Sequence, residues 1–147
     1  MRALIQRVKE ARVIVENETV GEIEKGLLIF LGVQKGDEEK HINWLVNKII
    51  SLRIFPDEAG KMNCSLKDVE GSLLIVSQFT LYGNCQNGRR PDFFESAPPE
   101  QAEKIYSQFI KECKKQVLNV STGVFGAMME VQLINDGPVT FMIDGKK

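Results

Sequence analysis

The sequence predicts a β-rich α/β fold, in which layers of sheet carry two main helices. Apolar runs rich in β-branched residues occupy both ends and the middle of the chain, whereas only two segments show helical periodicity. The length of 147 residues also suits one hydrophobic core, because a chain of this size buries about two-thirds of its unfolded surface. We therefore expect residues 1–147 to form a single domain.

The first third of the chain predicts a β-meander followed by a helix. Residues 3–16 and 18–33 read as strands, with Gly21 and Gly26 expected to act as breaks. Residues 37–53 then change period and place acidic residues in the first turn, which favours an amphipathic helix. Its expected apolar face consists of Ile42, Leu45, Val46, Ile49 and Ile50.

The middle of the chain alternates between loops and one buried strand. Residues 56–63, PDEAGKMN, are typical of a turn-rich loop. Residues 71–81, GSLLIVSQFTL, contain a continuous apolar run, which predicts a strand buried on both faces. Residues 82–99 form a long predicted loop, and loops of this length are often functional.

A second helix is predicted to begin at Pro98 and Pro99, since proline is favoured in the first helical turn. Its expected buried face consists of Ala102, Ile105, Tyr106, Phe109 and Cys113. The opposite face carries Lys104, Lys111 and Lys115, for which a solvated face is favoured over a phosphate-binding stripe.

The rest of the chain returns to predicted strands over residues 116–135 and 138–144. NDGPVT, residues 135–140, stands between two such runs. Asn, Asp, Gly and Pro all favour turns, so the residues alone indicate a turn that joins two strands.

Composition excludes several classes of protein. Nineteen basic and twenty acidic residues give a net charge of −1, so a protein that wraps long nucleic acid such as DNA is not expected, while a short contact with one end of an RNA stays open. The longest apolar run, GLLIFLGV, is too short to span a membrane. The N-terminus is charged throughout and does not resemble a signal peptide, so we expect a cytoplasmic protein.

Cysteine and histidine are sparse. Cys64, Cys85 and Cys113 are widely spaced and odd in number, which indicates neither a disulfide framework nor a zinc cluster. His41 is the single histidine and lies at the margin of the first helix, where an edge position is favoured over a catalytic one. No metal and no cofactor are therefore predicted.

SQFT, residues 77–80, ends the most apolar strand, and a strand end is a place where polar groups can point into a cleft. Ser77 and Thr80 are candidate nucleophiles. Each would need a base to activate its hydroxyl, and no histidine or lysine stands nearby in an obvious motif. On residue chemistry alone, a plain strand end is favoured over an active site.

Four motifs resemble the D-aminoacyl-tRNA deacylase family, also known as the D-tyrosyl-tRNA deacylase family. They are SQFTLYG at 77–83, GRRPDF at 88–93, TGVFGAMMEVQL at 122–133 and NDGPVT at 135–140. The N-terminal runs RALIQRVKEARV and GEIEKGLLIFLGV are similar as well, so the resemblance spans nearly the whole chain. A related subgroup that acts on other mischarged tRNAs departs from SQFT, and this sequence therefore resembles the D-specific branch.

The resemblance implies a homodimeric hydrolase with layers ordered sheet, sheet and helix. Its substrate would be aminoacyl-tRNA, and it would cleave the ester that joins a D-amino acid, or glycine, to the 3′-terminal ribose. The Gly137-Pro138 peptide would be cis and would enter the partner's pocket, where it leaves no room for an L side chain.

The resemblance also implies roles at seven further positions. Ser77, Gln78 and Phe79 would line the ester, with main-chain N–H groups stabilising the oxyanion. Thr80 is a candidate nucleophile, although the family is better described by attack of water assisted by the tRNA 2′-hydroxyl. The remaining roles are stacking of Phe125 on the terminal adenine, bracing of the Gly-Pro segment by Arg7 through carbonyls, and lining of the pocket by Met129.

The residues leave simpler roles open at three of these positions. Phe125 suits a core aromatic, Met129 suits a core filler, and Arg7 on an alternating strand suits a solvent-facing side chain. Two other functions also stay open: a Ser or Thr esterase that uses His41 or a carboxylate near residues 77–80, and a non-catalytic RNA-binding or oligomeric module in which NDGPVT is only an interface turn.

Overall fold

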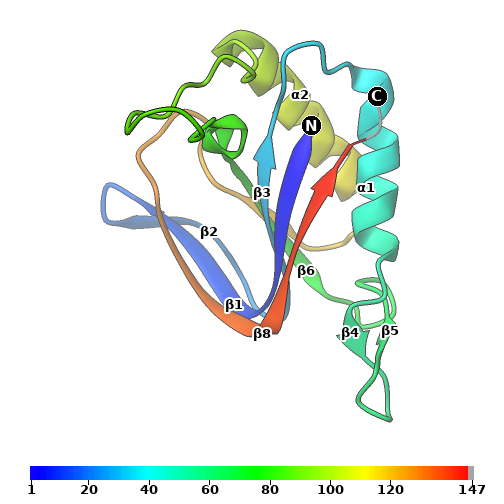
Figure 1. Ribbon diagram of the computed structural model, residues 1–147. Helices are drawn as coiled ribbons and strands as arrows, with labels where there is room; N and C mark the ends of the chain where they lie inside the picture. The colour runs from blue at the N-terminus through cyan, green and yellow to red at the C-terminus, as the bar shows by residue number, and fades with distance from the viewer. Residues whose placement is uncertain (146–147) are drawn as a thin grey trace.

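Six strands form one strongly curled sheet, and α1 and α2 pack against one side of it (Figure 1). The structure is a computed structural model that describes residues 1–145. The strands are β1 (Arg2–Val15), β2 (Glu18–Ile23), β3 (Gly26–Gly32), β4 (Phe55–Pro56), β5 (Met62–Cys64), β6 (Ser72–Ser77), β7 (Val120–Thr122) and β8 (Glu130–Asp144). The helices are α1 (Ile42–Ser51) and α2 (Pro99–Lys114), with short 3₁₀ turns η1 (Glu39–His41) and η2 (Phe79–Tyr82).

The curl comes from β1 and β8, which run antiparallel as one long bent ribbon. The sheet order is β2-β1-β3-β6-β7, and β8 also pairs with β1. Residues 2–8 of β1 pair with β3, whereas residues 11–15 pair with β2. The β1–β8 register shifts on both sides of Val8. Figure 1 shows the two strands bending together at the bottom of the sheet. Such irregularities bend a strand and increase its twist.

The bend gives the central strands two buried faces. Alternate side chains of a strand point to opposite faces. On one face Leu27, Ile29 and Ile75 join the core shared with both helices. The second core lies between the central strands and the other arm of the ribbon, and it contains Val8, Ala11, Val13, Ile23, Leu28, Leu74 and Val76. The order is sheet, sheet and helix, so the predicted fold class is confirmed.

Both helices bury the predicted faces. Ile42, Leu45, Val46, Ile49 and Ile50 are buried in α1, and Ala102, Ile105, Tyr106, Phe109 and Cys113 are buried in α2. The first helix begins later than the predicted residue 37, because Asp37 is buried in the preceding turn and accepts a 2.7 Å hydrogen bond from the Gln34 amide. Among the described residues, no helix has the length and apolar character needed to cross a membrane.

NDGPVT is not a turn between two strands, and the prediction from its residues was wrong. It lies inside β8, which continues from Glu130 to Asp144 and pairs with β1 on both sides of the motif. The motif lies where the β1–β8 register shifts. Residues 116–135 also differ from the prediction, because only the short strand β7 and the start of β8 are extended, with a loop between them.

Two further predictions need correction. Residues 56–63 are not only a loop, since β4 and β5 pair there in a small hairpin. Gly21 does not break a strand but lies within β2, where a Cβ atom would overlap the Thr122 carbonyl of β7. Gly26 begins β3, and a Cβ there would overlap the Ser72 carbonyl. Both glycines therefore allow close packing of neighbouring strands.

Gly26→Ala is expected to destabilise the protein by more than about 3 kcal/mol, because the added methyl group meets backbone that cannot move aside. Gly60→Ala is the matched control. Gly60 has φ +78° and open space around it, so this change should cost only about 1–2 kcal/mol of backbone strain. Urea unfolding of both variants measures the difference, and equal losses would contradict the packing argument.

Stability is also expected to fall as pH rises above 9. Burial raises the pKa of the Cys113 thiol from 9.0 to about 12 and that of the Tyr106 hydroxyl from 10.0 to about 12. The unfolded chain releases these protons first, so the stabilisation is complete below pH 9 and is lost towards pH 12. Urea midpoints from pH 8 to 11 should show the decline. In the Cys113→Ala, Tyr106→Phe double variant, the urea midpoint should decline less steeply with pH. The same slope as in wild type would contradict this account.

Candidate functional site

SQFT lies where the parallel strands β3 and β6 end. Ser77 is the last residue of β6 and pairs in register with Leu31 of β3. The Gln78 amide donates to the Leu31 carbonyl at 2.9 Å, after which the chain leaves the sheet as η2. Ser77 and Gln78 are half-buried, while Phe79 and Thr80 are exposed. The predicted catalytic residues therefore stand together at an accessible strand end.

One side-chain contact reaches the backbone of η2, and a second joins two side chains at its start. The Ser96 hydroxyl donates to the Phe79 carbonyl at 2.9 Å, and the Gln78 side-chain amide donates to the Thr80 hydroxyl. The first N–H groups of a helical turn have no acceptor within it. The Gln78 amide is already bonded, so the Phe79 and Thr80 amides are the donors available to a ligand at this strand end.

The segment after β7 leaves the sheet beside SQFT. The Gly123 amide donates to the Ile75 carbonyl at 3.1 Å, which places residues 123–129 next to the end of β6. Phe125 is half-buried, with its ring centroid 5.8 Å from that of Tyr106. Met129 is also half-buried and packs against the core between the two sheet layers. Both residues share the edge of SQFT and also contribute to the core.

Gly137 and Pro138 are exposed on β8, and the peptide bond between them is cis. Arg7, which is only 9% exposed, lies behind this segment. Its Nε donates to the Asp136 carbonyl at 3.0 Å and lies 3.1 Å from the Asp136 carboxylate. Its Nη1 donates to the Ile54 carbonyl at 2.6 Å. Arg7 therefore holds the segment through carbonyls and does not face solvent.

Asn135 holds the same segment from within β8. Its side-chain amide donates to the Arg7 carbonyl at 2.9 Å and to the Val139 carbonyl at 3.1 Å. Asn135 and Asp136 were not among the predicted site residues, nor was Ser96 beside η2. Asn135 and Asp136 are the first two residues of NDGPVT, so the motif could have indicated them. Nothing in the sequence indicated Ser96.

The structure does not bring Gly137-Pro138 and SQFT together within one chain. Arg7, which contacts the segment, pairs with Leu27, whereas Ser77 pairs with Leu31. Leu27 and Leu31 are four residues apart on β3, so the two motifs lie about 13 Å apart along the strand direction. Figure 1 shows the same arrangement, with the bend of β8 at the bottom of the sheet and the chain after β6 at the top.

No base is bonded to the candidate nucleophiles. Within residues 1–145, no hydrogen bond joins His41 or a carboxylate to Ser77 or Thr80, and His41 Nδ1 is buried without a partner at the start of α1. No three His, Cys, Asp or Glu side chains of the described chain could hold a metal ion. The arrangement can position and polarise an ester, but it supplies no side chain to activate a hydroxyl.

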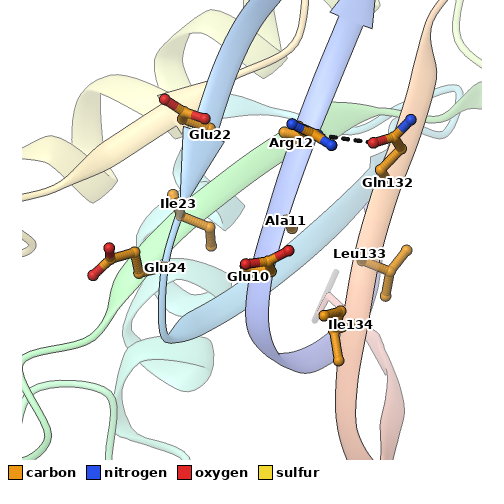
Figure 2. A pocket seen from close by; sticks show the side chains of 9 residues that line it. All are labelled: Glu10, Ala11, Arg12, Glu22, Ile23, Glu24, Gln132, Leu133 and Ile134. Atoms are coloured by element: carbon orange, nitrogen blue, oxygen red, sulfur yellow. Dashed lines mark hydrogen bonds between the residues drawn. The ribbon is translucent and has the colours of Figure 1, made fainter.

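A hollow of about 520 Å³ lies on the other arm of the ribbon, over β1, β2 and β8 (Figure 2). None of the predicted site residues lines it. Glu10, Glu22 and Glu24 line it together with Arg12, whose Nε donates to Gln132 at 2.8 Å. The excess of carboxylates disfavours a nucleic acid in this hollow.

Comparisons with known proteins agree with the motifs. Residues 4–144 match the family described as D-Tyr-tRNA(Tyr) deacylase. A D-aminoacyl-tRNA deacylase of Thermosipho africanus (strain TCF52B) is 61% identical, and one of Desulfotalea psychrophila (strain LSv54 / DSM 12343) is 60% identical. Each alignment covers 100% of this chain and 99% of the relative.

Solved structures share the fold. A c-Myc DNA unwinding element binding protein is 39% identical, with a TM-score of 0.94 and 100% of each chain covered. A probable eukaryotic D-amino acid tRNA deacylase, 17% identical with 97% of each chain covered, shows the fold alone at a TM-score of 0.84. These matches define the class, an α/β hydrolytic enzyme built on this curled sheet. The chain belongs to the D-Tyr-tRNA(Tyr) deacylase family, which confirms the resemblance.

Arg7→Ala is expected to lower the free energy of unfolding by about 2–4 kcal/mol, because it leaves two carbonyls and the Asp136 carboxylate without their charged partner. Arg7→Lys should recover part of this loss, since lysine keeps the charge but not the planar fork. Arg12→Ala is the control. Arg12 is an exposed arginine on the same strand, and its removal should cost less than about 1 kcal/mol. Urea unfolding should rank the variants in this order, and equal effects of Arg7→Ala and Arg12→Ala would contradict it.

Proposed function

We propose that the protein hydrolyses the ester between a D-amino acid and the 3′-terminal ribose of tRNA, accepts glycine and rejects L-amino acids. The observation that carries this proposal is identity of 61% over the whole chain to a D-aminoacyl-tRNA deacylase. The geometry adds support, because SQFT forms an accessible strand end where, within residues 1–145, the Phe79 and Thr80 amides are available as donors and no side-chain base is bonded to a hydroxyl. A role in the cytoplasm, where tRNA is charged, fits this activity.

The strand end suits catalysis by positioning and by stabilisation of charge. In the proposed reaction, the 2′-hydroxyl of the terminal ribose orients a water molecule, which attacks the ester carbonyl. The amides of Phe79 and Thr80 then stabilise the oxyanion, and one such donor is worth about 2.7–4 kcal/mol. The intermediate collapses by breaking the bond to the 3′-oxygen, which takes up the proton from the water. Ser77 and Gln78 line the ester in this arrangement.

Discrimination between D and L substrates is assigned to Gly137-Pro138 of a second subunit. Both residues are exposed and lie far from SQFT of their own chain, so only another copy can present them there. Their carbonyls would bind the substrate ammonium group, and their backbone would exclude an L side chain. The bonds from Arg7 and Asn135 keep this backbone in one orientation.

The outer edge of β8 offers a surface for the second subunit. β8 pairs only with β1 among the described strands, so its other edge has unpaired backbone groups. Ile134, Phe141 and Met142 of this strand are 40–52% exposed. A long exposed edge with apolar side chains is typical of a strand that a partner covers. We therefore propose a homodimer.

Phe125 and Met129 complete the proposed pocket. Their partly exposed surfaces share the edge of SQFT, where Phe125 would stack on the terminal adenine and Met129 would line the amino-acid side. Each is anchored by core contacts on its other side, and an anchored ring loses little entropy when a base stacks on it.

The decisive assay compares D-, L- and glycyl-tRNA that carry the same tRNA. We expect kcat/KM for the D-substrate to exceed that for the L-substrate by at least about a hundredfold, a difference of about 2.8 kcal/mol in transition-state binding. Glycyl-tRNA should also be cleaved, since it has no side chain to exclude. Equal cleavage of D- and L-substrates would overturn the chiral assignment. Failure to cleave either, with the fold intact, would favour a binding module.

Thr80→Ala should keep deacylation within about tenfold of wild type, because no base is bonded to the Thr80 hydroxyl. Replacing the terminal 2′-hydroxyl of the tRNA by hydrogen should cost more, roughly 10²–10⁴-fold, as expected for loss of a group that assists proton transfer. His41→Ala should have no effect on the rate. If Thr80→Ala or His41→Ala abolished activity in a folded protein, a conventional esterase mechanism would replace this one.

A further inference from the structure

Residues 84–94, here called the arginine loop, form a closed loop beside the proposed active site. Asn84 and Asp92 join its two ends through backbone hydrogen bonds of 2.9 and 3.1 Å and a side-chain bond of 3.1 Å. The Gln86 amide donates to the Asn84 side chain at 3.0 Å, and Gly88 supplies a left-handed turn with φ +71°. This closed base presents the residues between Asn84 and Asp92 to solvent.

Arg89 and Arg90 lie in this loop, and both are exposed. Within the described part of the chain, neither takes part in an ion pair or a side-chain hydrogen bond. The two acidic residues nearby have other partners, since Asp92 is bonded to Asn84 and Glu95 accepts from Gln34 at 2.7 Å. These bonds are to neutral amides, so both carboxylates keep their charge, but neither forms an ion pair with Arg89 or Arg90, and the loop presents two unpaired guanidinium groups to solvent.

The lysines of α2 are a weaker candidate for the same role. Lys104 pairs with Glu39 at 2.9 Å, and Lys115 pairs with Glu112 at 2.7 Å. Two of the three lysines in the predicted stripe are thus neutralised. This result supports the solvated face that the sequence favoured there, and it leaves the arginine loop as the better anion-binding surface.

Aromatic contacts connect the arginine loop to SQFT. The rings of Phe93 and Phe79 meet edge to face, with centroids 5.0 Å apart and planes at 63°. Phe94, the next residue, is 76% exposed. Arginines beside an exposed aromatic ring are the combination that binds single-stranded nucleic acid, because the charges contact phosphates while the ring stacks on a base.

We propose that the arginine loop binds the single-stranded acceptor end of the tRNA, just before the terminal adenosine. Arg89 and Arg90 contact its phosphates, and Phe94 stacks on an unpaired base. An unpaired strand fits better than a duplex, since the bases of a duplex are already stacked. This inference rests on the proposed function and extends it to a surface outside the catalytic pocket.

The test compares two substrates, full D-aminoacyl-tRNA and a D-aminoacyl-adenosine ester that has no phosphates. For the Arg89→Ala, Arg90→Ala double variant, we expect KM on tRNA to rise by roughly tenfold or more, with a far smaller change on the adenosine ester. The slope of log KM against log salt on tRNA should fall by about 1.4, or 0.7 for each lost contact to a single strand.

Two further variants separate charge from structure. Arg89→Lys with Arg90→Lys should restore most of the affinity for tRNA, because lysine also contacts phosphate. Lys111→Ala with Lys114→Ala is the matched control, since it removes two exposed positive charges near the far end of α2 and should leave KM on tRNA and the salt slope as in wild type. A control variant that lost as much affinity would show a general charge effect and overturn the proposal.

Phe94→Ala tests the stacking contact. It should weaken activity on tRNA by roughly fivefold to a hundredfold, with little effect on the adenosine ester and an unchanged molecular mass in light scattering. A change in mass would make Phe94 a subunit contact and overturn its role in binding RNA.

The outcomes distinguish this inference from the proposed function. If wild-type protein cleaved both substrates while the double alanine variant kept its KM and salt slope on tRNA, only the arginine loop assignment would fail. Equal losses on both substrates would likewise overturn it, because the arginines would then support the catalytic pocket. Wild-type protein that cleaved neither substrate would instead overturn the proposed function.

Discussion

The buried guanidinium of Arg7 lies at the bend of the β1–β8 ribbon, and the position of both arms depends on it. Arginine is seldom this deeply buried unless its donors are satisfied. Here they bond to Asp136 on the neighbouring strand and to the Ile54 carbonyl after α1. One side chain thus connects the ribbon to the helical layer, and the same contacts fix the segment that carries Gly137 and Pro138.

The site follows from where the strands end. β3, β6 and β7 are parallel, so their carboxyl ends meet at one edge and bring SQFT beside the segment that contains Phe125 and Met129. Gly137-Pro138 lies at the opposite end of the same strands. Under the proposed function both motifs contribute to one pocket, which would then need a second copy of the chain, and this arrangement favours a symmetric dimer.

Much of the fold could be predicted because its signals are local. Ile42 and Leu45 repeat at helical spacing, and the unbroken apolar run of β6 reflects burial on both faces. The turn predicted at NDGPVT was wrong because turn preference is a local property. The place of the motif inside β8 depends instead on pairing with a strand more than a hundred residues away. The role of Gly21 was mispredicted for a similar reason, because a glycine stands there to allow the close approach of β7. Residue chemistry alone did not favour SQFT as a site, because the role proposed for it depends on backbone amides and on segments that only the fold brings together.

The central claim is that each pocket takes SQFT from one subunit and Gly137-Pro138 from the other. Gln78→Trp would block the first half and Gly137→Val the second, and each should yield a folded but inactive homodimer. Co-expression should restore about a quarter of wild-type deacylation, because random pairing makes half of the dimers mixed and each mixed dimer has one intact pocket. A mixed preparation no more active than its separate parents would contradict the claim.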